Sequence, residues 1–171
     1  MSNQKNTVKE KKIKVYFDGC CEPKNPGGTA SYGIVIFKDN KKILKVSKIF
    51  EPVKGKEKQT SNNVAEYSGF KRALEWLLSK SLNNEEILIF SDSKLVICQM
   101  FGDIELGGRK WKIRSGYYKP IALQSREILN KFSNIKGQWI PREENSIADE
   151  LSKAELIRKG IEFKIQPKIA Y

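Results

Sequence analysis

Four acidic residues occupy positions at which chains often place catalytic groups. Asp18 and Asp92 each follow a short apolar run that is typical of a buried strand. Glu66 and Asp149 lie near the beginning of stretches with helical spacing, and we expect each in the first turn of a helix. If the two strands are parallel neighbours, Asp18 and Asp92 share the carboxyl edge of a sheet, where open α/β sheets bind ligands. Helix starts can lean over the same edge, so the four acids are predicted to converge.

Converging carboxylates need a counter-ion, because two of them about 5 Å apart repel by roughly 3 kcal/mol at an effective dielectric constant near 20. Hard divalent cations with oxygen ligands, Mg²⁺ or Mn²⁺, suit such a cluster. Two such ions about 4 Å apart can drive an in-line displacement at phosphorus. We therefore expect a site for two Mg²⁺ ions, for which Mn²⁺ can substitute, formed by Asp18, Glu66, Asp92 and Asp149.

Each acid also has a simpler explanation. Asp18 precedes a glycine and could be a turn residue, and Glu66 could be favoured by the helix dipole. Asp92 could cap a helix, and Asp149 could be an ordinary solvated acid. None of the four acids is strong evidence for a metal site on its own, so the prediction of this site depends on their joint placement.

The order of elements predicts one α/β domain. Strands are expected at 13–17, 30–37, 42–50, 87–90 and 135–140, and helices at 64–78, 95–100, 119–132 and 146–159. Asn62 or Asn63 is a plausible N-cap of the first helix. Short hairpins make the first three strands antiparallel, whereas the later strands need crossovers and should be parallel. We expect a five-stranded mixed sheet flanked by helices, with a polar N-terminal tail at 1–11, the domain at 12–159 and a C-terminal tail at 160–171.

Charge and cysteine content narrow the class of partner. The net charge of +12 favours an anionic partner, most often nucleic acid, although a lysine-rich surface is the simpler alternative. The chain has three cysteines and no histidine, which argues against a disulfide framework and a Cys/His zinc site. No segment is typical of a secretion signal or a membrane helix. We expect a cytoplasmic protein that does not act at a membrane and is a monomer by default.

Five segments, in this order and spacing, resemble type 1 ribonuclease H. They are Tyr16-Phe17-Asp18-Gly19, Asn25-Pro26-Gly27-Gly28, Thr60-Ser61-Asn62-Asn63-Val64-Ala65-Glu66-Tyr67, Ser91-Asp92-Ser93-Lys94-Leu95-Val96 and Pro141-Arg142-Glu143-Glu144-Asn145-Ser146-Ile147-Ala148-Asp149-Glu150-Leu151. The resemblance covers about residues 12 to 155 and is greatest to the archaeal-type subgroup. It implies the ribonuclease H-like fold and an endonuclease that hydrolyses the RNA strand of RNA/DNA hybrids, leaving 5′-phosphate and 3′-OH ends.

The resemblance also implies a role for each acid. Asp18 would bridge both metal ions, and Asp149 would join it on the ion that activates water. Glu66 and Asp92 would hold the second ion, and Glu66 would lie near a ribose 2′-OH, the group that distinguishes RNA from DNA. Further nucleic-acid contacts are implied for Asn25, Ser61, Asn62, Asn63 and Ser93.

Two features depart from the family's usual pattern. Many members carry a mobile histidine before the last aspartate, whereas Arg142 stands in the comparable loop here. Arginine cannot act as a base at neutral pH but can contact phosphate or position the product, and a surface charge is the alternative. Residues 101–118 are too short and too glycine-rich for the extra basic helix that some members have. Their interleaved basic and aromatic residues suit phosphates and sugars, or a loop packed on the body.

Two other functions stay open at this point. The first is a metal nuclease of the same fold that acts on double-stranded RNA rather than on hybrids. The second is a non-catalytic module that binds nucleic acid through its charge. The presence of all four acids argues against the second, because a binding module has no use for them.

Overall fold

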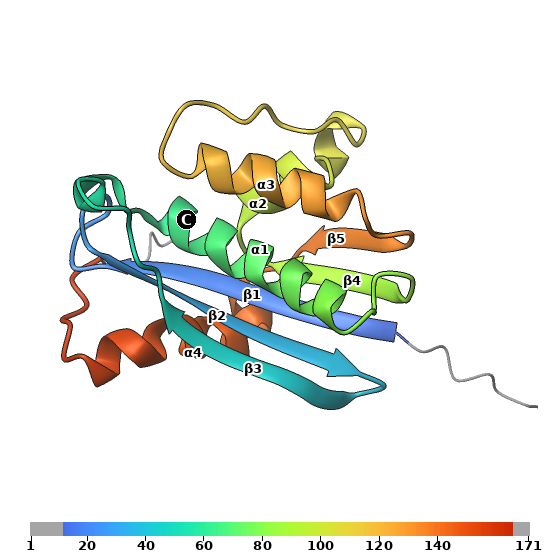
Figure 1. Cartoon of the computed structure of the whole chain (residues 1–171), viewed down its shortest axis with the longest axis horizontal. Helices are drawn as coiled ribbons and strands as arrows, with labels where there is room; N and C mark the ends of the chain where they lie inside the picture. Colours follow the sequence, from blue (N-terminus) through green and yellow to red (C-terminus); the bar gives the residue numbers. More distant parts are fainter. Residues whose placement is uncertain (1–11, 166–171) are drawn as a thin grey trace, which may run out of the picture.

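The computed structural model describes residues 12–165 (Figure 1). The strands are β1 (Lys12–Glu22), β2 (Thr29–Lys38), β3 (Lys41–Ile49), β4 (Glu86–Ser91) and β5 (Ile135–Trp139). The helices are α1 (Asn62–Ser79), α2 (Lys94–Met100), α3 (Lys119–Leu129) and α4 (Ser146–Arg158), with short 3-10 turns η1 (Glu57–Gln59), η2 (Ile104–Leu106) and η3 (Arg142–Asn145). The predicted N-terminal tail, 1–11, and residues 166–171 of the predicted C-terminal tail lie outside the described residues.

The five strands form one mixed sheet in the order β3-β2-β1-β4-β5. β1 and β2, and β2 and β3, pair antiparallel, whereas β4 is parallel to both β1 and β5. Figure 1 shows α1 and α3 on one face of the sheet and α4 on the other. This is the predicted fold class, and the carboxyl ends of β1 and β4 lie at the same edge as expected.

Side-chain periodicity explains why α1 packs where it does. Val64, Tyr67, Phe70, Leu74 and Leu77 recur at helical spacing and are all fully buried. They face the buried residues of β1 and β4, and together these residues form one hydrophobic core. Burying this stripe holds the beginning of α1 beside the sheet edge at which the predicted acids lie.

Glycines allow the helices to approach the strands closely. Any side chain at Gly19 of β1 would overlap the backbone nitrogen of Glu66 in α1. On the other face, a Cβ atom at Gly33 of β2 would lie 2.5 Å from the carbonyl oxygen of Ala148 in α4. Both helices that carry a predicted acid can therefore sit directly against the sheet.

Several predicted boundaries are wrong. Asp18 does not end the first strand, because β1 continues to pair with β2 as far as Glu22 after its pairing with β4 has ended at Tyr16. The N-cap of α1 is Ser61, whose hydroxyl accepts from the backbone of Val64, rather than Asn62 or Asn63. α1 begins at Asn62, so Glu66 lies beyond its first turn.

The other boundaries differ less. α3 ends at Leu129 rather than at 132, and Phe132 enters the core from the turn that follows. Asp149 lies in the first turn of α4 as predicted. No helix among residues 12–165 is long and apolar enough to cross a membrane.

Candidate active site

A cleft of about 630 Å³ opens at the sheet edge beyond β1 and β4. Asp18, Glu66, Asp92 and Asp149 all line it. Asp18 lies on β1, Glu66 on α1 and Asp149 on α4, and Asp92 is the residue after β4. Four separate parts of the chain therefore supply one acid each. The convergence predicted from their sequence positions is what the structure contains.

Asp18 is the most enclosed of the four acids. Its residue is only 7% exposed, and the hydroxyl of Ser152 donates to Asp18 Oδ2 at 3.2 Å. Burial, followed by the charges of Asp92 and Glu66, raises the pKa of Asp18 well above its ordinary value. An ordinary turn residue can stay exposed to solvent and avoid the free-energy cost of burial beside other acids. The simpler explanation of Asp18 as a turn residue therefore does not fit.

Asp92 is held by residues that precede α4. The side-chain amide of Asn145 donates to Asp92 Oδ1 at 2.7 Å and to the carbonyl oxygen of Phe17 at 2.9 Å. The indole of Trp139 donates to the backbone carbonyl of Asp92 at 3.1 Å. The cap of α2 is Ser93, which accepts from Val96, so the Asp92 carboxylate is not needed as a cap. Asn145 thus ties β1, next to Asp18, to the residue that follows β4.

Glu66 is bound to a neighbouring helix cap. The hydroxyl of Ser93 donates to Glu66 Oε2 at 2.6 Å. Burial raises the pKa of Glu66 to about 7, although the hydrogen bond from Ser93 acts in the opposite direction. Because Glu66 lies past the first turn, the helix dipole does not account for its position.

Asp149 lies between two cations. Arg142 Nη2 is 2.8 Å from its Oδ1 atom, and Lys153 Nζ is 2.6 Å from its Oδ2 atom. All three residues line the cleft. Arg142 was singled out from the sequence, whereas Lys153 was missed although its position four residues after Asp149 on a helix could have indicated the contact. Asn145 was missed because its partners Phe17 and Asp92 are remote in the sequence.

The predicted nucleic-acid contacts divide into two groups. Asn25 and Asn62 line the cleft, and Asn25 Oδ1 accepts from the backbone nitrogen of Asn62 at 3.0 Å. Ser61 and Ser93 serve as helix caps at its rim, and Asn63 is not among the residues that line it. The structure therefore places two of the five predicted contacts directly in the cleft.

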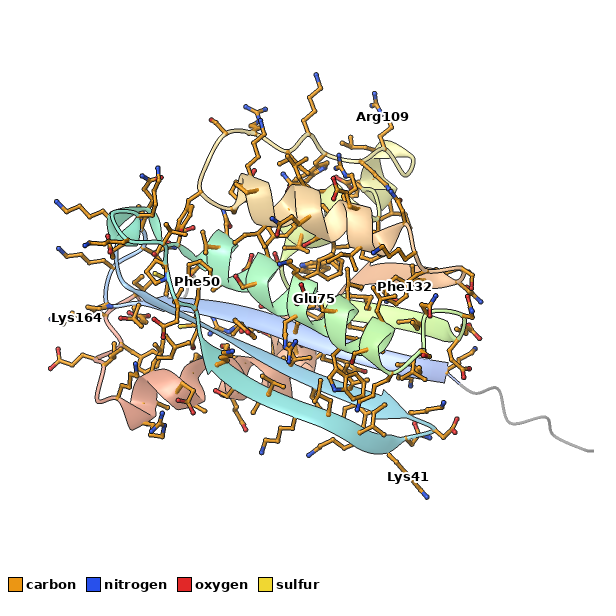
Figure 2. The ribbon with its side chains drawn as sticks, in the orientation of Figure 1. Lys41, Phe50, Glu75, Arg109, Phe132 and Lys164 are labelled. Carbon is orange, nitrogen blue, oxygen red and sulfur yellow. The ribbon has the colours of Figure 1, made fainter. Side chains whose placement is uncertain are left out.

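The loop between α2 and α3 partly packs on the body, as one of the two interpretations from the sequence held; its contact with phosphates and sugars stays a prediction. It contains only the short turn η2, so the extra helix of some family members is absent from it. Two of its tyrosines pack on the body, since Tyr118 stacks on Tyr67 of α1 and Tyr117 contacts Phe50, whereas Trp111 donates to Asp103 within the loop at 2.8 Å. Its basic side chains stay exposed, and Arg109 points away from the body (Figure 2).

The donor set suits hard divalent ions. Four carboxylates in one partly buried cleft repel one another, and a cation would relieve the repulsion that raises the pKa of Asp18. Among residues 12–165, however, no three acidic, Cys or His side chains are grouped tightly enough to hold one ion as they stand. Glu66, Asp92 and Asp149 are each bound by protein donors instead.

Comparison with known proteins identifies the family. A family model described as "Reverse transcriptase-like" matches residues 16–155. The chain belongs to this family. Its resemblance to type 1 ribonuclease H is confirmed by solved structures. LC11-RNase H1, solved in complex with an RNA/DNA hybrid, is 31% identical with a TM-score of 0.69, and the match covers 86% of this chain and 98% of that one.

Two further relatives agree. RNase H1 from the archaeon Halobacterium salinarum has the same fold, with a TM-score of 0.68, 24% identity, and coverage of 86% of this chain and 98% of that one. The "Bifunctional protein Rv2228c" of Mycobacterium tuberculosis is 33% identical over 75% of this chain. The match spans only 31% of that protein's length, so this chain corresponds to one part of it. The N-terminal part of Rv2228c has been solved as an RNase H domain, and it matches with a TM-score of 0.67 and 27% identity over 84% of this chain and 97% of that one.

Proposed function

We propose that this protein is an endonuclease that hydrolyses the RNA strand of RNA/DNA hybrids and leaves 5′-phosphate and 3′-OH ends. The observation that carries the proposal is the convergence of Asp18, Glu66, Asp92 and Asp149 in one cleft. A protein with a net charge of +12 gains nothing structurally from gathering four acids, two of which have raised pKa values. LC11-RNase H1, which was solved with a hybrid bound, supports this substrate.

The four acids would hold two Mg²⁺ ions, or Mn²⁺ in their place. Asp18 would bind both ions, Asp149 would share the first, and Glu66 and Asp92 would share the second. When bound, such a pair of ions supplies an activated water and neutralises the charge that develops on the phosphate. No histidine is present in the chain to act as a base, and the guanidinium of Arg142 cannot take a proton at neutral pH.

The other groups of the cleft would bind and orient the substrate. Arg142 and Lys153, once Asp149 is taken by a metal ion, are cations in the cleft that can contact phosphate oxygens. Asn25 and Asn62 can donate to and accept from the minor-groove edge of a hybrid, where amide groups recognise shape and 2′-hydroxyls rather than sequence. The hydrogen bond between them fixes the loop that carries Asn25.

The test is cleavage of an end-labelled RNA/DNA hybrid with Mg²⁺ or Mn²⁺. Wild type and Asp39→Asn, which removes an acid in the β2–β3 turn, should make internal cuts that leave 3′-OH ends. Asp92→Asn should make none, although it can still accept the hydrogen bond from Asn145. Failure of folded wild type to cut the hybrid with either metal would refute the proposal.

The same assay on double-stranded RNA separates the two nuclease functions. We expect cleavage of the hybrid to be much faster, and faster cleavage of double-stranded RNA would change the assigned substrate. Calorimetric titration with Mg²⁺ addresses the binding-module alternative. A module without catalysis would show no Mg²⁺ binding that depends on Asp92.

A further inference from the structure

The chain continues beyond α4 into a segment that forms one side of the catalytic cleft. Ile157, Phe163 and Ile165 line the same cleft as the four acids. We call these three residues the apolar wall; Ile157 lies in the last turn of α4, and Phe163 and Ile165 lie in the segment that follows it. The matched family model ends at residue 155, so the three residues of the apolar wall come after the segment that it matches.

A buried carboxylate anchors the segment that carries the wall. Glu22, the last residue of β1, is only 4% exposed, and its Oε2 atom accepts from the backbone nitrogens of Lys164 at 2.9 Å and Ile165 at 3.1 Å. Within residues 12–165, no lysine or arginine forms an ion pair with Glu22. A buried charge of this kind is costly unless it is hydrogen-bonded. The two backbone donors meet that need, so the anchor holds the segment in one place.

The anchored segment leaves its apolar side chains uncovered. Ile157, Phe163 and Ile165 are 64%, 41% and 39% exposed, whereas Lys164 between the last two pairs with Glu162 at 3.2 Å. A segment whose purpose was only to stabilise the fold would bury these side chains against the body. Figure 2 shows Lys164 at the end of the molecule where β1 turns into β2, which is also where the cleft loop with Asn25 lies.

The geometry points to a substrate subsite: the apolar wall packs against the sugars of the RNA strand beside the scissile phosphate. A paired hybrid presents phosphates, sugars and base edges, and the cleft offers a counterpart for each. The acids with their metal ions suit the phosphate, Asn25 and Asn62 suit the polar groove edge, and the apolar wall suits the carbon face of the sugars. This inference rests on the proposed function and names a further contact of the same site.

The primary test is hybrid binding by the double variant Phe163→Ala/Ile165→Ala. Fluorescence anisotropy with a labelled RNA/DNA hybrid in EDTA measures the Kd without cleavage, and steady-state kinetics in Mg²⁺ measure KM and kcat. We expect Kd and KM to rise about tenfold, since each lost apolar contact weakens binding by a few-fold, while kcat changes less than about twofold. Leu123→Ala on α3 is the matched control, because Leu123 is 42% exposed and does not line the cleft.

Salt dependence distinguishes an apolar contact from a phosphate contact. The slope of log Kd against log salt concentration reports the number of neutralised phosphates. The Phe163→Ala/Ile165→Ala variant should show the same salt slope as wild type, with a Kd that is higher by the same factor at every salt concentration. A smaller slope would mean that the segment acts through charge, and it would overturn the assignment.

Release of the anchor provides a second variant. Glu22→Ala removes the acceptor of Lys164 and Ile165, and it should raise Kd in the same direction even though no wall side chain is changed. An unchanged Kd in both variants would leave the wall a structural feature and refute the subsite. A lower Kd in the Phe163→Ala/Ile165→Ala variant would show that the segment obstructs the cleft, which also refutes the subsite. If wild type neither binds nor cuts the hybrid, the proposed function fails together with the inference; if it does both, only the wall is in question.

Discussion

At the residue scale, the charge state of Glu66 links stability to pH. Burial raises the pKa of Glu66 to about 7, whereas an unfolded glutamate titrates near pH 4.5. Between these values the folded state binds more protons than the unfolded state, so stability falls as pH rises and levels off above about pH 7. Without metal, Glu66→Gln should therefore exceed wild type in free energy of unfolding above pH 7, by about 1–2 kcal/mol after allowance for partial solvent exposure.

Urea denaturation in EDTA at several pH values measures this difference. Glu75→Gln on the same helix lies outside the cleft and should not show the same pH trend (Figure 2). Mg²⁺ should raise the free energy of unfolding of wild type, whereas it should not raise that of Glu66→Gln. If wild type instead gained stability relative to Glu66→Gln between pH 5 and about 7, the pH dependence would have the opposite sign. That result would contradict a raised pKa of Glu66 in the folded state.

Arg142 is the second residue whose role can be isolated. Its guanidinium donates to Asp149 Oδ1 and competes with a metal ion for that carboxylate. Arg142→Ala should therefore slow turnover by roughly tenfold through loss of a phosphate contact, yet bind Mg²⁺ as tightly as wild type or more tightly. Single-turnover kinetics and calorimetry measure the two effects.

Arg158→Ala is the control for Arg142→Ala. Arg158 makes a comparable ion pair with Glu155 on α4 but does not line the cleft. Unchanged single-turnover rates in Arg142→Ala would reduce Arg142 to a surface charge. Loss of Mg²⁺ binding in that variant would give it a structural role at the metal site instead.

At the element scale, the approach of β1 to α1 sets the distance between Asp18 and Glu66. A methyl group at Gly19 would overlap the backbone of α1, and backbone atoms cannot rotate away. Gly19→Ala should cost at least about 2 kcal/mol of unfolding free energy and most of the activity, because the two acids are forced apart. Gly55→Ala is the contrast: its φ of 87° makes the substitution strained, but nothing lies within 4 Å of the added atom. An equal effect of both substitutions, measured by thermal unfolding and by hybrid cleavage, would show that close approach is not the cause.

The elements themselves were largely predictable from the sequence. Buried stripes such as Val64, Tyr67 and Phe70 repeat at helical spacing, and apolar runs end in turn residues, so local pattern alone located α1 and the strands. The end of β1 was not predictable, because Asp18 to Glu22 are held by pairing with β2 after β4 has diverged. The cap of α1 was wrong because serine and asparagine are nearly equal as caps, and only the backbone geometry chooses Ser61.

The contacts that complete the site were the least predictable. Asn145 reaches the carbonyl of Phe17, 128 positions away, and Glu22 holds Lys164, 142 positions away. Neither spacing leaves a local signature in the sequence. The four acids were found because each follows an apolar run or lies early in a helical pattern of the sequence, whereas the groups that hold them are defined by tertiary packing. The division of the chain into a domain and two tails stays a prediction.

At the scale of the whole molecule, the net charge of +12 should dominate association with nucleic acid. Neutralised phosphates release counter-ions, so hybrid binding should weaken by about tenfold or more between 50 and 200 mM salt. Anisotropy titrations across that range measure the slope. If salt did not change the affinity, the positive charge of the protein would not contact the phosphates of the hybrid.

Part of the charge does lie elsewhere, at the outer strand of the sheet. Within the described residues, 12–165, β3 pairs with β2 alone, so its other side presents backbone groups that another extended chain could pair with. Lys41, Lys42, Lys45 and Lys48 all lie on this strand, and Lys41 points away from the body (Figure 2). Two such strands brought together would set like charges against each other, so these lysines protect the protein from edge-to-edge aggregation. The basic character of this protein would thus serve solubility as well as the proposed binding of a hybrid, and we expect replacement of the lysines of β3 to lower solubility before it weakens that binding.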